Sequence, residues 1–216
     1  PVLLRKKFLG GRGIDAYILL NYVKPGIDPL GPENYISFGA GILVGTGMPG
    51  CARLHISAKS PLTGMFGSSN MGGEFAPEMR YAGYDHIVIT GRADKPVYLW
   101  INDDDVEIRD ASMLWGKNTW DTEKAIREMH GNQQIKVITI GPAGESLVRF
   151  ASVISPLKNA AGRTGMGAVM GSKNLKAIAV RGRKGVPLED AQKVLELRRE
   201  MTDRVLSSKS IKAMRA

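Results

Sequence analysis

Residues 159–167 read NAAGRTGMG, and the chain continues as AVMGSKNLKA to residue 177. Glycine lets successive backbone N–H groups converge on one concavity, which suits an anion, and the start of a following helix adds partial positive charge. Arg163 lies among these glycines, and a guanidinium donates two parallel hydrogen bonds to phosphate oxygens. The segment therefore predicts an anion-binding loop that leads into a short turn or helix over residues 168–174.

A second glycine-rich segment lies earlier in the chain. Residues 63–73 read TGMFGSSNMGG and lead into a short helix expected over residues 74–82, which Gly83 closes. Arg53 begins the expected strand that precedes this loop. Two such loops together predict a site for two phosphates side by side. Either loop alone is also compatible with a tight turn that binds nothing.

The sequence around the two loops repeats itself. The matching segments occur in the same order and at nearly the same offset, which indicates a duplicated unit of strand, SPL turn, glycine-rich loop, short helix and strand. Chance similarity of common glycine dipeptides is the alternative. The matches are 46–50 with 140–144, 53–54 with 149–150, 60–62 with 155–157, 71–72 with 166–167, and 87–92 with 178–183.

The order of the expected elements indicates the fold class. Strands and helices do not alternate regularly, so the pattern favours an α+β fold with largely antiparallel pairing over a doubly wound fold. The segments on either side of 103–105 alternate in hydrophobicity and predict a hairpin. Strands are expected at 35–44, 53–58, 86–90, 97–102, 106–109, 135–140, 148–154 and 176–181, and helices at 14–23, 119–129 and 188–206.

Composition limits the classes of protein. The 216 residues suffice for one good core, and no apolar run reaches the length of a membrane span. The start of the chain lacks the apolar stretch of a signal peptide. Cys51 is the one cysteine, so the chain alone forms no internal disulfide and supplies no four-cysteine cluster. A single free cysteine is typical of a reducing, cytoplasmic setting.

Most motifs of other enzyme classes are absent. Residues 165–171 match a dinucleotide fingerprint, but neither a strand before them nor an acidic residue about 20 positions later is expected. His55, His86 and His130 are far apart in the sequence. His55 and His86 lie in strand patterns and are interpreted as structural. The aspartates 103–105 are expected to be solvated at a turn. The chain offers no general acid–base pair, so we expect no catalytic residue in it.

Several longer motifs resemble the N-terminal domain of aldehyde:ferredoxin oxidoreductases. The resemblance covers nearly the whole chain, in the right order. It implies two β-sheets related by pseudo-twofold symmetry, which form a saddle beneath a tungsten (or molybdenum) bis-pterin cofactor. The motifs are FLGGRG at 8–13, SPLTG at 60–64, SNMGG at 69–73, YAGYD at 81–85 and GRTGMGAVMGSKNLKA at 162–177.

The resemblance also implies the residues of the site. A Mg²⁺ that bridges the two pterin phosphates would be bound by the backbone carbonyls of Asn70 and Thr164. Arg53 and Arg163 match arginines that approach the pterins and phosphates, and Arg53 would also lie near an iron–sulfur cluster. Mg²⁺ between two phosphates, with arginines around it, offsets their repulsion. The remaining cofactor contacts would come from Met71, Gly72, Gly73, Gly165 and Gly167.

The resemblance further implies that this chain is one part of an enzyme. Residues 1–186 would be the cofactor-binding domain, and 187–216 a helix and linker into downstream domains that carry the ligands of a [4Fe–4S] cluster. The whole enzyme would oxidise aldehydes to carboxylic acids, pass electrons to ferredoxin or another electron-transfer subunit, and form a homo-oligomer in the cytoplasm. This fragment alone would be inactive.

Two other functions remain open at this point. The net charge of +9 is compatible with a basic nucleic-acid-binding module, although the basic residues are scattered and aromatic residues are only 6%. A domain that binds no cofactor and serves in assembly is the second alternative. We expect neither nucleic acid nor a membrane as a partner.

Overall fold

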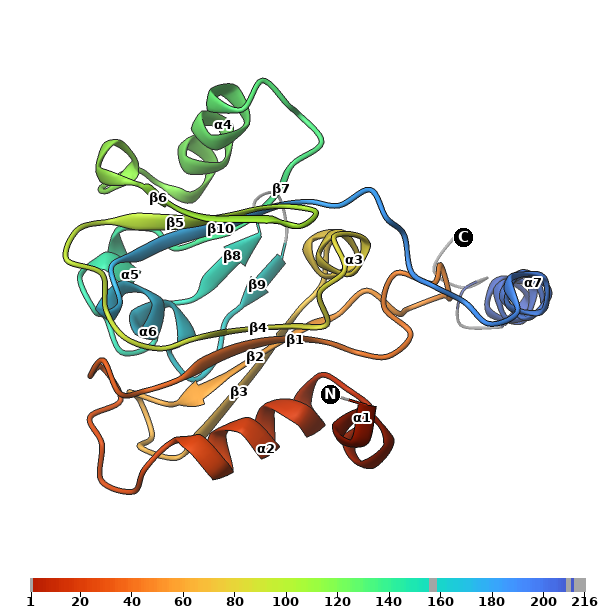
Figure 1. Cartoon of the computed structure of the whole chain (residues 1–216), viewed down its shortest axis with the longest axis horizontal. Coiled ribbons are helices and arrows are strands. Elements are labelled where there is room, and N and C mark those ends of the chain that lie inside the picture. Colours follow the sequence, from red (N-terminus) through yellow and green to blue (C-terminus); the bar gives the residue numbers. More distant parts are fainter. Residues whose placement is uncertain (1, 156–158, 209–210, 212–216) are drawn as a thin grey trace.

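The computed structural model describes residues 2–155, 159–208 and 211. It is an α+β fold with two β-sheets, which confirms the expected class (Figure 1). The first sheet has the strand order β3-β2-β1-β4, and all its pairs are antiparallel. Its strands are β1 (Ile36–Ala40), β2 (Leu54–Lys59), β3 (Phe66–Met71) and β4 (His86–Ile89).

The second sheet has the strand order β6-β5-β10-β7-β8-β9. Its pairs are antiparallel except for β5 and β10, which run parallel. The hairpin of β5 and β6 is the one predicted around the aspartates 103–105. The strands are β5 (Val97–Asn102), β6 (Asp105–Asp110), β7 (Lys136–Thr139), β8 (Val153–Ser155), β9 (Asn159–Ala161) and β10 (Leu175–Arg181).

The two sheets contain the same unit twice. In the first copy β1, β2, β3, helix α3 (Phe75–Tyr81) and β4 follow one another, and in the second β7, β8, β9, helix α6 (Met166–Ser172) and β10 do so. The spatial orders β3-β2-β1-β4 and β9-β8-β7-β10 correspond strand for strand. The copies differ at one edge: β10 is extended by β5 and β6, whereas β4 has no further strand partner among the described residues.

The two helices of the repeat lie between the sheets (Figure 1). Helix α3 contacts β1, β7 and β10, and α6 contacts β1, β2 and β10. The inward side chains of both sheets and both helices form one apolar core, which includes Phe38, Phe75 and Ile178. The sheets and helices therefore stabilise one another through a shared core rather than through two separate ones.

Other helices cover the outer faces. Helices α1 (Val2–Phe8) and α2 (Arg12–Tyr22) lie outside the first sheet, where α2 contacts β1, β2 and β3. Helix α4 (Thr119–Met129) has the predicted bounds and covers the second sheet near β7. The 3₁₀ turn η1 (Ser112–Leu114) precedes it. The short helix α5 (Pro142–Glu145) packs against α6. The sequence pattern did not predict α1.

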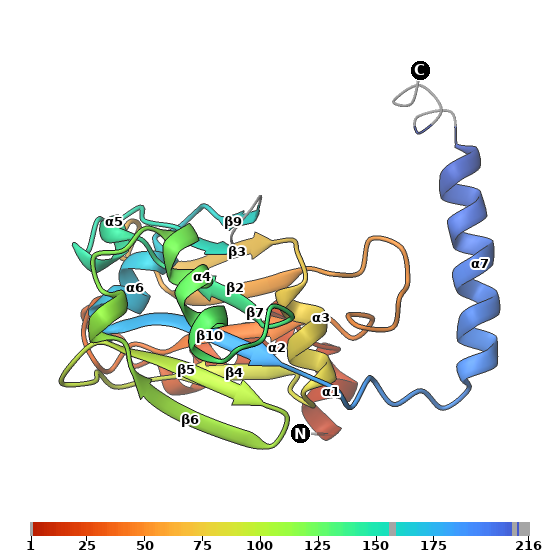
Figure 2. The same ribbon diagram turned by 90° about the horizontal axis from the view of Figure 1, so that it is seen from above.

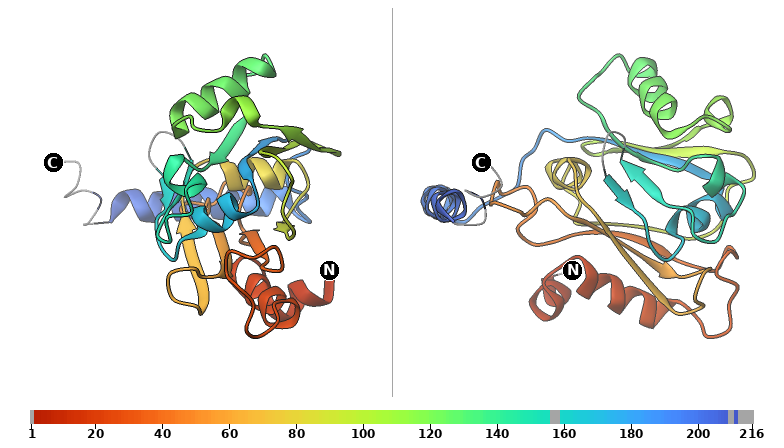
Figure 3. Two further views of the ribbon diagram at one scale, coloured as in Figure 1. Left: turned by 90° about the vertical axis from the view of Figure 1, so that its left-hand side faces the viewer. Right: turned by 180° about the vertical axis from the view of Figure 1, so that it is seen from behind.

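The last helix stands apart from the sheets. Helix α7 (Ala191–Ser207) projects beyond the body of the domain in Figures 2 and 3. None of its residues is buried, although Leu195, Met201 and Val205 are apolar. The division at residue 186 stays a prediction.

Some predicted boundaries were wrong. Residues 148–152 form turns instead of strand, and only Val153–Ser155 are extended as β8. The first glycine-rich loop contains strand β3, and the second begins with β9, because polar and small residues pair with β2 and β8 once those strands are in place. The matched dipeptides 71–72 and 166–167 are not equivalent, since β3 ends at Met71 whereas Met166 begins α6. The second SPL turn extends outside the described residues.

Candidate functional site

The structure brings the two glycine-rich segments together. Strands β3 and β9 are in contact, and two hydrogen bonds link their surroundings. The Ser60 hydroxyl donates to the carbonyl oxygen of Thr164 over 2.8 Å, and the backbone N–H of Arg163 donates to the Ser69 hydroxyl over 3.3 Å. Asn70 directly follows Ser69 in the chain. The two positions predicted to bind Mg²⁺ therefore belong to one surface where the two halves of the fold meet.

The end of β3 packs directly against the second half. Met71 is buried, and the two glycines that follow it lie against the Asn159 side chain. A Cβ atom on Gly72 would lie 2.8 Å from Asn159 Oδ1, and one on Gly73 would lie 3.0 Å from Nδ2. Gly73 also has a φ of 100°, which L-residues rarely adopt. The φ of Gly73 thus favours glycine there without a ligand, whereas a Cβ atom on Gly72 would meet only the end of the Asn159 side chain.

The start of α6 is tightly packed in the same way. A Cβ atom on Gly165 would lie 2.0 Å from the carbonyl oxygen of Arg149, and one on Gly167 would lie 2.5 Å from that of Ser152. The turn at 148–152 therefore occupies the space that side chains would need. The sequence had explained these glycines by close approach to a cofactor, and the structure supplies a reason within the protein.

Thr164 has an unusual backbone conformation. Its φ is 63°, in the left-handed region, and Gly165 follows with a φ of 75°. A β-branched residue in this region is strained by about 1–3 kcal/mol, and such strain is concentrated at ligand-binding sites. The Thr164 hydroxyl donates to the Arg163 carbonyl over 2.7 Å. The sequence gives no signal of this conformation, because threonine is not typical of it.

Arg53 and Arg163 are both exposed. Within residues 2–155 and 159–208 neither guanidinium forms an ion pair with a carboxylate. Their donors are therefore available for an anion at the surface of the domain. Arg163 lies at the junction of the halves through its backbone bond to Ser69, whereas Arg53 precedes β2.

His55 lies beneath this surface and contacts β3. It is 4% exposed and pairs across the strands with Asn70. Its Nδ1 atom lies 2.9 Å from Asn70 Oδ1, and its Nε2 atom lies 3.1 Å from the Ser68 hydroxyl. Burial lowers the pKa of His55, so the neutral imidazole is favoured. The interpretation of this histidine as structural fits these contacts.

The sequence did not predict a buried carboxyl group that lies beside His86 on the outer face of the first sheet. Asp15 of α2 is fully buried and accepts hydrogen bonds from the hydroxyls of Ser37, over 2.5 Å, and Ser57, over 3.3 Å. Its Oδ1 atom lies 3.6 Å from His86 Nε2. Burial raises the pKa of Asp15 to about 7. The available signal was an aspartate on the apolar face of α2, next to Ile14 and four positions before Leu19.

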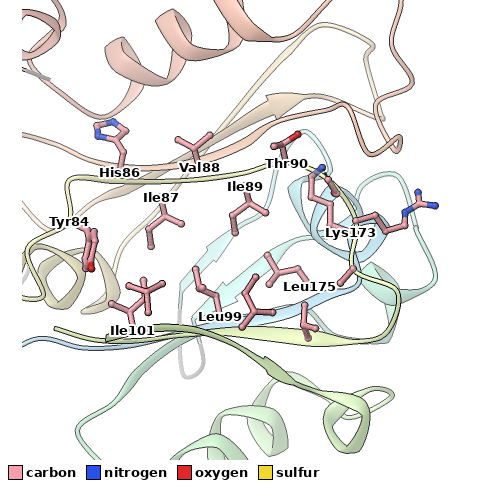
Figure 4. A pocket seen from close by; sticks show the side chains of 16 residues that line it. Tyr84, His86, Ile87, Val88, Ile89, Thr90, Leu99, Ile101, Lys173 and Leu175 are labelled. Atoms are coloured by element: carbon pink, nitrogen blue, oxygen red, sulfur yellow. Dashed lines mark hydrogen bonds between the residues drawn. The ribbon is translucent and has the colours of Figure 1, made fainter. Parts of the chain in front are cut away.

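A large apolar cavity lies elsewhere. It has a volume of about 660 Å³ and opens between β4 and the hairpin of β5 and β6 (Figure 4). Its walls are mainly apolar, with Ile87 and Ile89 facing Leu99 and Ile101, and Lys173 near one end. This composition suits packing rather than phosphate binding.

The described residues form no metal site from side chains alone. They include no group of three or more His, Cys, Asp or Glu side chains placed to hold a metal ion. None of their helices is long and apolar enough to cross a membrane. The junction of the halves thus brings the segments of Asn70 and Thr164 together and exposes the Arg163 side chain.

Comparison with known proteins identifies the family. The model of the family described as "Aldehyde ferredoxin oxidoreductase, N-terminal domain" matches residues 2–182. The tungsten-containing aldehyde ferredoxin oxidoreductases of Pyrococcus furiosus and Thermococcus kodakarensis are each 50% identical over 202 residues, which cover 94% of this chain and 33% of each relative. The aliphatic sulfonate oxidoreductase, WOR-like subunit, of Pyrococcus furiosus is 40% identical over 218 residues, covering 94% of this chain and 35% of that protein.

A solved structure agrees with these matches. The active site complex BamBC of benzoyl coenzyme A reductase contains a chain with a TM-score of 0.92 and 42% identity, over 95% of this chain and 31% of that one. The present chain thus spans about a third of the length of these relatives. By sequence and by fold, the chain belongs to the family of aldehyde ferredoxin oxidoreductase N-terminal domains.

Proposed function

We propose that this domain binds the phosphate ends of a tungsten bis-pterin cofactor, together with one Mg²⁺, across the junction of its two halves. The observation that carries the proposal is the joining of both glycine-rich segments by the bonds from Ser60 to Thr164 and from Arg163 to Ser69. Two loops held at one surface suit a ligand with two anionic ends.

The donor groups at the junction fit such a ligand. Carbonyl oxygens are ligands that Mg²⁺ accepts, and the strained Thr164 is held in place by its neighbours. The carbonyl of Thr164 already accepts one hydrogen bond from Ser60, and its second lone pair remains for a cation. The exposed guanidiniums of Arg53 and Arg163 supply positive charge and bidentate donors for phosphate oxygens.

The function of the whole protein follows from its relatives as a further part of the proposal. The 50% identical relatives are tungsten-containing aldehyde ferredoxin oxidoreductases, so we assign the full-length protein the oxidation of aldehydes to carboxylic acids with ferredoxin as acceptor. When bound, the tungsten centre supplies the two-electron redox chemistry. Downstream domains would provide the ligands of a [4Fe–4S] cluster and the acid–base groups, and the enzyme would act as a cytoplasmic homo-oligomer.

The test is a metal analysis of full-length protein carrying Arg163→Ala. Loss of a charge-assisted hydrogen bond costs about 1.5–3 kcal/mol, so cofactor retention should weaken roughly tenfold or more. Tungsten, magnesium and phosphorus per polypeptide should fall together. Arg109→Ala is the matched control, because Arg109 lies on β6 and pairs with Glu107, away from the junction.

Two results would contradict the proposal. If wild-type full-length protein contains neither tungsten nor molybdenum and no pterin, the proposed cofactor is wrong. Full cofactor content in Arg163→Ala protein would remove the role of that guanidinium. Aldehyde-dependent reduction of ferredoxin by the wild-type protein tests the substrate and the acceptor separately.

A further inference from the structure

Strand β3 holds Asn70 at the edge of a sheet. It pairs with β2 on one side only, and on the other side it meets the second half through the bond between Ser69 and Arg163. Burial alternates along the strand, with Asn70 and Phe66 exposed. Edge strands are held by fewer hydrogen bonds than central ones. The position of Asn70 therefore depends on the pairing of β3 with β2 and on the side-chain contacts that β3 makes.

His55 provides two of these contacts. It is the cross-strand partner of Asn70, and both nitrogens of its buried ring reach β3. The amide oxygen of Asn70 only accepts hydrogen bonds, so Nδ1 of His55 carries the proton and donates. Nε2 then accepts from the Ser68 hydroxyl. A single neutral tautomer thus satisfies all three side chains at once, and it fixes the Asn70 side chain relative to β2.

We propose that His55 is a positioning residue for the Mg²⁺ site, acting through Asn70. By holding the Asn70 side chain, it fixes the end of β3 from which the Asn70 carbonyl would bind the ion. This inference rests on the proposed function, because it assumes that Mg²⁺ binds at the junction. Groups that orient a metal ligand commonly change metal affinity by 10–100-fold when they are removed.

The substitutions follow from the roles of the two ring nitrogens. His55→Leu fills a similar volume but leaves Asn70 Oδ1 without its donor. His55→Asn places an amide donor close to the position of Nδ1 and should rescue the interaction with Asn70. In full-length holoenzyme, we expect His55→Leu to release Mg²⁺ at least about tenfold faster into excess chelator, and His55→Asn to release it within a few-fold of the wild-type rate.

A double variant separates positioning from general destabilisation. If His55 acts through Asn70, Asn70→Ala and the double variant His55→Leu/Asn70→Ala should release Mg²⁺ at the same rate. His130→Asn is the matched control: this histidine lies beside Trp100 and within 3.1 Å of the Tyr98 hydroxyl on the second sheet, far from β3 in the fold. It should leave the release rate unchanged. Thermal unfolding of each variant is recorded alongside.

Each outcome supports or overturns the positioning role of His55. Release from His55→Leu protein at the wild-type rate, or multiplied effects of the two single substitutions, overturns the positioning role while leaving the proposed function intact. Wild-type holoenzyme without Mg²⁺ overturns the proposed function and this inference together. If His55→Leu protein does not fold, Asn70→Ala still tests the positioning role, because it alters only an exposed side chain. An Asn70→Ala protein that releases Mg²⁺ at the wild-type rate overturns the inference.

Discussion

The two halves of this domain share a topology but differ in the layer between each sheet and its covering helix. Under α2, the first sheet presents Ser37, Ser57 and His86 to the buried carboxyl group of Asp15. Under α4, the second sheet presents an apolar layer that packs against Ile126. The members of that apolar layer include Tyr98, Trp100, Val137, Ala177 and Ala179.

The comparison shows that the two copies share their inner faces and differ in their outer faces. Both inner faces are apolar and contribute to one core, whereas the outer face of the first sheet is the more polar of the two. A buried polar layer is tolerated when its groups are hydrogen-bonded, but it contributes less net stability than an apolar one of similar area. The first half therefore has less stabilisation from its outer layer.

The largest expected effect concerns a contact that only the second half has. Helix α6 packs against α5, and a Cβ atom on Gly171 would lie 1.9 Å from the carbonyl oxygen of Gly144. Because backbone cannot move away cheaply, Gly171→Ala should cost at least about 4 kcal/mol of unfolding free energy. Urea unfolding measures this. Gly64→Ala, at a φ of 72° with open space around it, should cost only about 1–2 kcal/mol.

The next effect tests the apolar outer layer. Ile126 of α4 is fully buried against the second sheet, and Ile126→Ala should lower the unfolding free energy by about 3 kcal/mol through lost burial and a residual cavity. Its counterpart in the polar layer, Ser57→Ala, removes a hydrogen bond of 3.3 Å and should cost about 1 kcal/mol. Equal costs in the two layers, measured in the same urea series, would contradict the comparison.

The smallest effect is a pH dependence of the polar layer. Burial raises the pKa of Asp15 from 3.8 to about 7, so the folded protein keeps a proton that the unfolded chain releases above about pH 4. This group therefore destabilises the fold increasingly from pH 4 to pH 7, and fully above pH 7. Asp15→Asn removes the charge. Between pH 5 and pH 8 the variant should gain roughly 1–3 kcal/mol relative to wild type.

Other titratable groups near Asp15 also contribute to the pH dependence of the unfolding free energy. Burial lowers the pKa of His86, which penalises the folded state when the pH falls below about 6.5 in both proteins. Because Asp15 Oδ1 lies 3.6 Å from His86 Nε2, the difference between variant and wild type reports the titration of Asp15 together with its coupling to His86. Unfolding curves across pH 5–8 provide the measurement. A difference that stays constant over this range would show that Asp15 is ionised throughout.

Much of the fold was predictable because local patterns agreed with it. The alternation on either side of 103–105 predicted the β5–β6 hairpin, and the periodicity of 119–129 predicted α4 with its observed ends. Strands β3 and β9 were not predicted, because their small and polar residues carry no strand pattern and extend only by pairing with β2 and β8. Here tertiary pairing outweighed local propensity.

Some features of the candidate site were likewise predictable from the sequence, and others were not. Glycine content and Arg163 marked the two loops, and the structure brings the loops to one surface. Phosphate binding at that surface stays a prediction. The left-handed conformation of Thr164 and the contacts of His55 with β3 were not predictable, since each depends on residues distant in the chain. Asp15 was missed because its hydroxyl partners lie on other elements.

The sequence by itself determined the fold class, the duplicated unit, the family and the two loops, because these depend on local periodicity, glycine content and motif order. Only the tertiary structure decided that β3 and β9 are strands, that the loops are joined by Ser60 and Ser69, and that polar and apolar layers cover opposite sides. Hydrogen bonds and packing between distant residues form only when the chain is folded, so no local pattern encodes them separately.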